Sequence, residues 1–134
     1  MDKSQLRKQL QERQHEMAGL LRLFMLRPSL IRGSVYLLRR KCGKTNCRCQ
    51  EGHLHESWVL SVPEKGRKRM RTVPKGKRLK WQQMADNYRR FRHARTQLVK
   101  LFEEILRLVD ELERERTVAP PLSKGERDAA DPRL

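Results

Sequence analysis

The sequence predicts an α+β fold: an N-terminal helix, a small three-stranded antiparallel sheet with a Cys/His zinc knuckle, and a long C-terminal helix of coiled-coil character. Apolar residues recur at three- and four-residue steps near both ends of the chain, which is typical of amphipathic helices. In the middle, β-branched and aromatic residues alternate with polar ones, which is typical of strands. All three cysteines and two of the four histidines lie between Arg39 and Ser57.

The first segment, residues 1–28, is predicted to be an amphipathic helix over residues 2–27. Pro28 ends it, because the residue before a proline is biased away from helical geometry. Arg13 interrupts the apolar stripe. Because the helix is amphipathic, we expect its stripe to need a surface to pack on. The stripe consists of Leu6, Leu10, Met17, Leu20/Leu21 and Phe24.

The second segment, residues 31–76, is predicted to be the zinc-stapled sheet. Its strands are expected at residues 33–38, 56–62 and 67–73, with a hairpin turn at residues 63–66, where Pro and Gly bracket two polar residues. The alternation of side chains places Trp58, Leu60 and Val62 on one face of the second strand. In the third strand, the same alternation gives a basic face of Arg67, Arg69 and Arg71.

The third segment, residues 77–116, is predicted to be one long helix with Leu101 and Leu108 widening its apolar seam. At about 1.5 Å per residue it spans about 60 Å, of which the first helix can cover only about 39 Å. We therefore expect the long helix to pack on the first helix, on a partner, or on both. The expected seam is Met84, Tyr88, Phe91, Arg95, Leu98, Phe102, Ile105, Val109 and Leu112. Residues 117–134 contain three Pro and no periodicity, so we expect a disordered tail.

The cysteine cluster, Cys42-x4-Cys47-x-Cys49 followed by His53 and His55, favours a structural metal site. Structural Zn²⁺ takes four thiolate or imidazole ligands, so three cysteines and one histidine complete a set. Two other interpretations stay open, namely three reduced thiols in a turn region and a redox or nucleophilic cysteine. The redox interpretation is weaker because the spacing lacks CxxC. A metal also offsets the small apolar content of the sheet.

The charge distribution indicates a polyanion-binding face. The net charge is +16, and residues 32–95 carry nineteen Lys/Arg against four acidic residues, a net of +15. A basic region concentrated in one part of a chain is the electrostatic footprint of nucleic-acid binding. The candidate contacts are Arg39, Arg40, Lys41, Lys44, Arg48, Arg67, Lys68, Arg69, Arg71, Lys75, Lys77, Arg78, Lys80, Arg89, Arg90 and Arg92. Stacking of bases on Trp58, Trp81 or Tyr88 is a weaker expectation, since core packing is the commoner role.

The stretch "IRGSVYLLRRKCGKTNCRC", followed by "HESW", "TVPK" and "NYRRFR", resembles a widespread family of short, uncharacterised prokaryotic proteins associated with transposases and other mobile elements. The resemblance covers Ile31 to Leu112, and "KCGK-x-x-CRC" is its most specific part. A histidine just before an aromatic-rich strand in that family corresponds to His55, which the resemblance favours over His53 as the fourth ligand. Relatives read "HGP" where this chain reads "HES".

The leading hypothesis is a non-enzymatic nucleic-acid-binding accessory protein, linked to a mobile element or transposase, that binds DNA in preference to RNA. The alternative is a coiled-coil adaptor whose basic face binds an acidic partner. The long helix is expected to form a homodimer or to bind a transposase-like protein. An enzyme is disfavoured because the few acids of the basic segment are scattered. No signal peptide is visible and no stretch is long enough to span a bilayer, which predicts a cytoplasmic, nucleoid-associated location without membrane contact.

Overall fold

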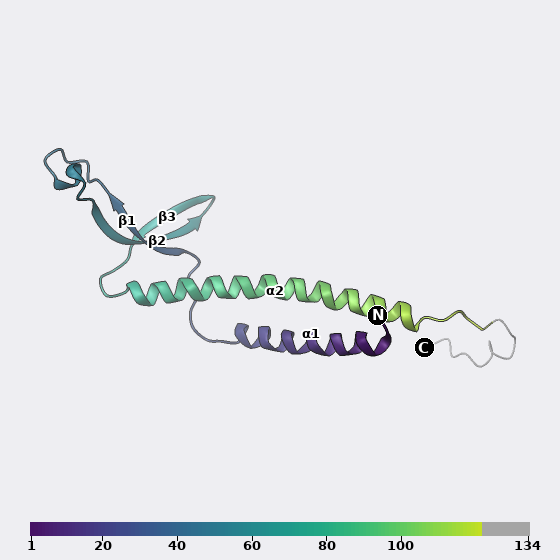
Figure 1. Cartoon of the computed structure of the whole chain (residues 1–134). Coiled ribbons are helices and arrows are strands. Elements are labelled where there is room, and N and C mark those ends of the chain that lie inside the picture. The colour runs from purple at the N-terminus through teal and green to yellow at the C-terminus, as the bar shows by residue number, and fades with distance from the viewer. Residues whose placement is uncertain (122–134) are drawn as a thin grey trace. The chain divides into compact units, whose positions relative to one another are not determined.

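The computed structural model describes residues 1–121 and confirms the fold class: an N-terminal helix, a three-stranded antiparallel sheet with the Cys/His cluster near it, and a long C-terminal helix (Figure 1). Two compact units are distinguished, Met1–Ala18 with the chain from Val99 onward, and Gly19–Leu98. The elements are α1 (Lys3–Phe24), β1 (Ser34–Arg40), the short 3₁₀ helix η1 (Arg48–Glu51), β2 (His55–Glu64), β3 (Arg67–Thr72) and α2 (Arg78–Arg116).

Helix α1 begins with a capping box that the periodicity did not predict. The Gln5 backbone N–H donates to the Asp2 carboxylate at 2.8 Å, and the Asp2 backbone N–H donates to the Gln5 side-chain oxygen at 3.1 Å. This reciprocal pair satisfies two N–H groups that have no partner inside the helix. The helix is shorter than predicted at its far end, since it stops at Phe24, before Pro28.

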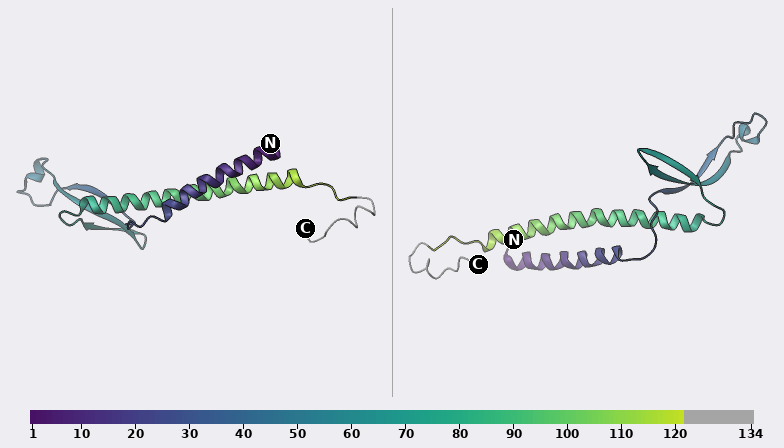
Figure 2. Two further views of the ribbon diagram at one scale, coloured as in Figure 1. Left: turned by 90° about the horizontal axis from the view of Figure 1, so that it is seen from below. Right: turned by 180° about the vertical axis from the view of Figure 1, so that it is seen from behind.

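In the first unit, the beginning of α1 runs antiparallel beside the end of α2 (Figure 2). Leu6, Leu101 and Leu108 are buried there. Arg13, which interrupts the apolar stripe of α1, forms an ion pair with Glu104 at 3.1 Å. The stripe therefore tolerates Arg13 because a carboxylate of α2 receives its guanidinium.

In the C-terminal half of α2, every second residue of the predicted seam is exposed, so the prediction is wrong at those positions. Phe91, Leu98, Ile105 and Leu112 are half-buried as expected, but the positions between them are shifted by one residue. The shift keeps the Arg95 guanidinium in water, which avoids the free-energy cost of burying a charge. The exposed residues of the predicted seam are Arg95, Phe102 and Val109, and the buried ones that take their place are Ala94, Leu101 and Leu108.

The second unit contains the sheet, in the order β1-β2-β3 with both pairs antiparallel. Its core is small and joins the sheet to the start of α2. Trp58 and Val62 pack beside Leu60 on this core, as the alternation along the strand predicts. The four buried core residues are Val35, Leu60, Val73 and Ala85. Across residues 1–121, no helix is both long and apolar enough to cross a membrane.

The hairpin between β2 and β3 turns at two residues, not over the predicted residues 63–66. Strand β2 continues through Pro63 to Glu64, which pairs with Arg67. Lys65 and Gly66 have φ values of 48° and 78°. Positive φ at both central residues is typical of a type I′ turn, whose twist matches that of the flanking strands.

Gly33→Ala is expected to destabilise the sheet by about 1–3 kcal/mol, in the range of other overpacking substitutions. A Cβ atom on Gly33 would lie 2.6 Å from the Ser61 carbonyl oxygen and 3.0 Å from the Leu60 side chain. Because the nearest atom belongs to the backbone, the strand itself would have to move. Urea unfolding monitored by circular dichroism measures the loss.

The matched control is Gly19→Ala, within α1. No atom lies within 4 Å of a Cβ built on Gly19, and alanine is the better helix former by about 1 kcal/mol. We expect this variant to be as stable as the unsubstituted chain or slightly more stable. Equal destabilisation by both substitutions would contradict the close approach at Gly33.

Candidate metal centre

Three thiols and one imidazole converge in the loop that joins β1 to β2. The ligand atoms of Cys42, Cys47, Cys49 and His55 all lie within 4.8 Å of one another. Figure 1 shows this loop extending beyond the ends of the two strands. Thiolate and imidazole groups are common metal ligands, so this cluster can bind a metal ion.

The strand pairing and the loop backbone bring the four residues together. His55 is the first residue of β2 and pairs with Arg40 at the end of β1, two residues before Cys42. Cys47 is the N-cap of η1, and Cys49 lies within that helix. Gly52, with φ of 101°, ends η1 in the left-handed conformation, which glycine adopts without steric cost. The chain can therefore turn back to His55 within six residues of Cys49.

The contacts inside the cluster form two pairs. The Cys42 and Cys49 sulfurs are 3.5 Å apart, and the Cys42 backbone N–H donates to the Cys49 sulfur at 3.3 Å. The Cys47 sulfur lies 3.2 Å from His55 Nε2. All three cysteines are free thiols. Cys49 is fully buried, whereas Cys42 and His55 are exposed, so the loop covers the site on one side.

Hydrogen bonds prepare two of the thiols to act as thiolates. A backbone hydrogen bond from Lys44, then one from the Cys49 side chain, lowers the pKa of Cys42. A backbone hydrogen bond from Cys49, then one from the His55 side chain, lowers the pKa of Cys47. At Cys49 the Cys42 backbone N–H favours the thiolate, but burial and the neighbouring sulfurs outweigh it and raise the pKa. A bound cation would remove that repulsion between sulfurs.

Of the two histidines that the sequence offers, the structure brings His55 to the three sulfurs and leaves His53 outside the group. The His53 backbone N–H donates to the Arg48 carbonyl at 3.3 Å, so His53 helps to close the loop through its backbone. His55, and not His53, belongs to β2, and its pairing with Arg40 holds it at the end of β1.

All the basic residues predicted as nucleic-acid contacts are exposed, but some already have partners. Arg39 pairs with Glu56 at 3.2 Å, and Arg69 lies 3.5 Å from Glu64. The Arg78 guanidinium lies 4.0 Å from the centre of the Trp58 ring. This contact and the core packing of Trp58 and Trp81 leave those two indoles in structural roles.

A group of cations in the second unit surrounds a hollow of about 410 Å³, here called the cationic pocket. Arg32 comes from the segment before β1, Lys68 from β3 and Arg89 from α2, so three separate segments supply its charges. Hydroxyl groups complete the lining, which consists of Arg32, Gly33, Ser34, Tyr36, Ser61, Pro63, Lys68, Tyr88 and Arg89.

Sequence reasoning missed Arg32 and Tyr36 as candidate contacts, although both lie in the quoted motif "IRGSVY". Because Gly33 has no Cβ atom, the chain can lie close to the Ser61 carbonyl of β2, beside the pocket. A glycine that no turn requires, directly after an arginine, was the available signal.

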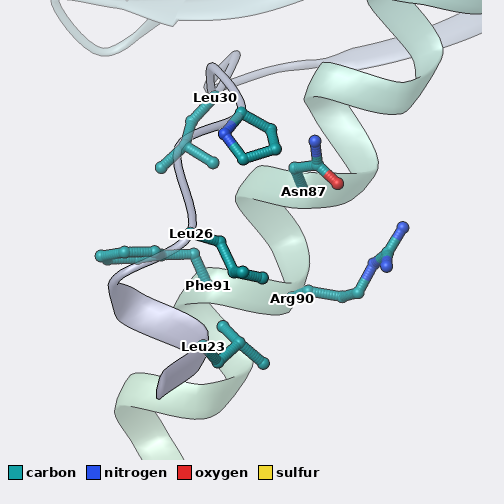
Figure 3. A pocket seen from close by; sticks show the side chains of 7 residues that line it. Leu23, Leu26, Leu30, Asn87, Arg90 and Phe91 are labelled. Atoms are coloured by element: carbon teal, nitrogen blue, oxygen red, sulfur yellow. The ribbon is translucent and has the colours of Figure 1, made fainter. Parts of the chain in front are cut away.

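Arg90, another predicted contact, lies beside an apolar pocket of about 110 Å³ at the end of α1. Leu23, Leu26, Leu30 and Phe91 provide most of its wall (Figure 3). The Arg90 guanidinium extends away from these apolar side chains. Phe91 also meets Phe24 edge to face, with ring centres 4.9 Å apart.

Residues 4–83, more than half of the chain, match the model of a domain of unknown function (DUF6788). The match includes α1, the sheet and the whole Cys/His cluster, and it begins and ends earlier than the resemblance over Ile31 to Leu112 predicted. No curated protein and no solved structure matches the chain.

Proposed function

The chain belongs to the DUF6788 family of domains of unknown function, and from that premise we propose that it is a non-enzymatic nucleic-acid-binding protein. In this proposal a structural Zn²⁺ holds the sheet, and the basic residues of the second unit bind phosphates. The observation that carries the proposal is the cationic pocket, in which Arg32, Lys68 and Arg89 from three segments meet around one hollow.

The donor set and its spacing support zinc as the metal. With Zn–S bonds of about 2.3 Å, two sulfurs on a tetrahedron around zinc lie about 3.8 Å apart. The closest donor pairs of the cluster are 3.5 Å and 3.2 Å apart, and the longest separation is within 4.8 Å. A small contraction or expansion of the loop therefore places all four donors on one ion. Three protein thiolates and one imidazole leave no open position, which is typical of a structural site.

The cationic pocket supports phosphate binding because guanidinium and ammonium groups there have hydroxyl donors beside them. Most protein–nucleic acid hydrogen bonds go to phosphates, and Arg, Lys, Ser and Tyr are among the usual donors. Arg89 already pairs with Asp86, so Arg32 and Lys68 supply the charge that a phosphate would meet first. The proposal also includes a preference for binding DNA over RNA, a cytoplasmic location and a link to mobile elements. These parts are supported by the amino-acid sequence and its resemblance alone.

Three of the four acidic residues of the basic segment support a non-enzymatic role. Glu56, Glu64 and Asp86 each pair with a different arginine. The Arg89 side chain, followed by that of Gln82, lowers the pKa of Asp86. Divalent-metal phosphoryl chemistry needs carboxylates gathered on one ion, whereas these carboxylates neutralise separate guanidinium groups.

The alternative is an adaptor that works through α2. It is favoured by large apolar side chains that α2 exposes, including Phe102 and Leu106. In this function the basic face would bind an acidic protein, and the long helix would bind a second copy or a transposase-like protein.

The two functions are separated by filter binding of duplex DNA, single-stranded DNA and RNA over a salt series. The nucleic-acid hypothesis expects binding at low salt that weakens steeply as salt rises, because phosphate contacts release counterions. The adaptor hypothesis expects no salt-dependent binding to any of the three. Absence of binding at the lowest salt would reject the proposed function.

A further inference from the structure

Tyr36 is an exposed aromatic side chain in the wall of the cationic pocket. Its neighbour Val35 belongs to the core of the second unit, and successive residues of a strand point to opposite faces of the sheet. Tyr36 therefore lies on the face of the sheet away from that core, and 38% of it is exposed. We propose that the cationic pocket binds a nucleotide whose base is unpaired, with the phosphate on Arg32 and Lys68 and the base stacked on the Tyr36 ring.

The pairing of the strands places polar side chains on the same face as Tyr36. Ser34, two residues before Tyr36, shares this face and pairs with Ser61. Ser61 in turn pairs with Met70 of β3, and Lys68, two residues before Met70, shares the face as well. One face thus offers an aromatic ring, two aliphatic hydroxyl groups and an ammonium group, and all of these residues except Met70 line the pocket.

A contact across the sheet holds the Tyr36 ring in place. The Tyr36 hydroxyl donates to the Met70 sulfur at 3.7 Å, from β1 across β2 to β3. A side chain that is already held loses less conformational freedom when a ligand packs on it. Tyr88 of α2 lines the same pocket but is half-buried, so Tyr36 is the more exposed of the two rings.

Cations, hydroxyl groups and an aromatic ring in one hollow match the parts of a nucleotide. Protein sites for single strands combine positive charge along the backbone with aromatic rings on which bases stack. The volume of about 410 Å³ lies within the range of about 300–1,000 Å³ for small-ligand pockets. A duplex keeps its bases inside the stack, so it offers phosphates to the pocket but no free base. The inference rests on the proposed function and adds a base contact to its phosphate contacts.

Two probes that differ only in their bases test the inference on the unsubstituted chain. Fluorescence anisotropy at constant low salt compares a short oligothymidylate with an abasic strand that has the same number of phosphates. One stacked base strengthens binding by at least about fivefold, so the oligothymidylate is expected to bind at least about fivefold more tightly. The same probes built on ribose distinguish a DNA strand from an RNA strand as the source of the nucleotide.

Variants of Tyr36 assign the effect to this ring, with the ratio of the two affinities as the readout. Tyr36→Leu removes the ring and is expected to bring the ratio close to one. Tyr36→Phe is expected to keep the ratio, because phenylalanine retains the ring face without the hydroxyl. The matched control is Phe102→Leu, which removes an exposed aromatic ring outside the pocket and is also expected to keep it. Circular dichroism verifies that each variant folds.

The outcomes separate this inference from the proposed function. Equal affinity of the unsubstituted chain for the two probes, or a ratio that Tyr36→Leu leaves unchanged, would overturn the inference. If duplex DNA still bound with a steep salt dependence, the proposed function would stand without the base contact. Failure to bind duplex DNA and both single strands would reject the proposed function, and the inference with it.

Discussion

Cys49→Ser is expected to reduce zinc content from about one ion per chain to nearly none and to unfold the loop between β1 and β2. Cys49 is the fully buried member of the Cys/His cluster, and its sulfur accepts a hydrogen bond from the Cys42 backbone N–H. Even changes to groups outside the ligand set lower metal affinity by about 10–100-fold, so loss of a ligand should exceed that range. Metal analysis after dialysis measures the content, and amide hydrogen exchange at His55 and Glu56 measures the local unfolding.

The two histidines provide the matched control for this experiment. His55→Ala is expected to lose zinc as Cys49→Ser does, because the His55 imidazole lies among the sulfurs. His53→Ala is expected to retain zinc, because the His53 imidazole lies outside the cluster. Equal zinc retention by both histidine variants would remove His55 from the ligand set. A metal-free unsubstituted chain whose mass is two hydrogens lower than that of the reduced chain would indicate a disulfide and reject the zinc proposal.

The triple variant Arg32→Gln, Lys68→Gln, Arg89→Gln is expected to weaken DNA binding by about tenfold or more at low salt. Each phosphate contact to duplex DNA contributes about 0.9 to the slope of log K against log salt. Removal of three contacts should therefore make that slope shallower by about 2 to 3. Filter binding at several salt concentrations measures both quantities.

A second triple variant with the same loss of charge controls for the change in net charge. Lys3, Arg7 and Lys8 are exposed on α1, and their replacement by Gln also lowers the net charge by three. We expect a much smaller change of slope for this variant, because these three residues do not line the cationic pocket and so make none of its phosphate contacts. If both triple variants lose the same affinity and slope, the cationic pocket has no special part in binding.

Much of the fold followed from local patterns in the sequence. The alternation of Trp58, Leu60 and Val62 identified the core-facing side of β2. Pro28 set only an upper limit for α1, which stops earlier, at Phe24. The seam of α2 could not be obtained this way in its C-terminal half. Two apolar stripes one residue apart share the same helix, and periodicity cannot tell which of Leu101 and Phe102 is buried.

Three cysteines and two candidate histidines with suitable spacing were readable from the sequence alone, as was the concentration of positive charge in residues 32–95. The tertiary structure decided which groups meet. Strand pairing of His55 with Arg40 brought one imidazole to the thiols, and the antiparallel sheet and α2 brought Arg32, Lys68 and Arg89 around one hollow. Spacing along the chain limits how far apart two side chains can lie, but only packing between segments fixes which distant side chains become neighbours.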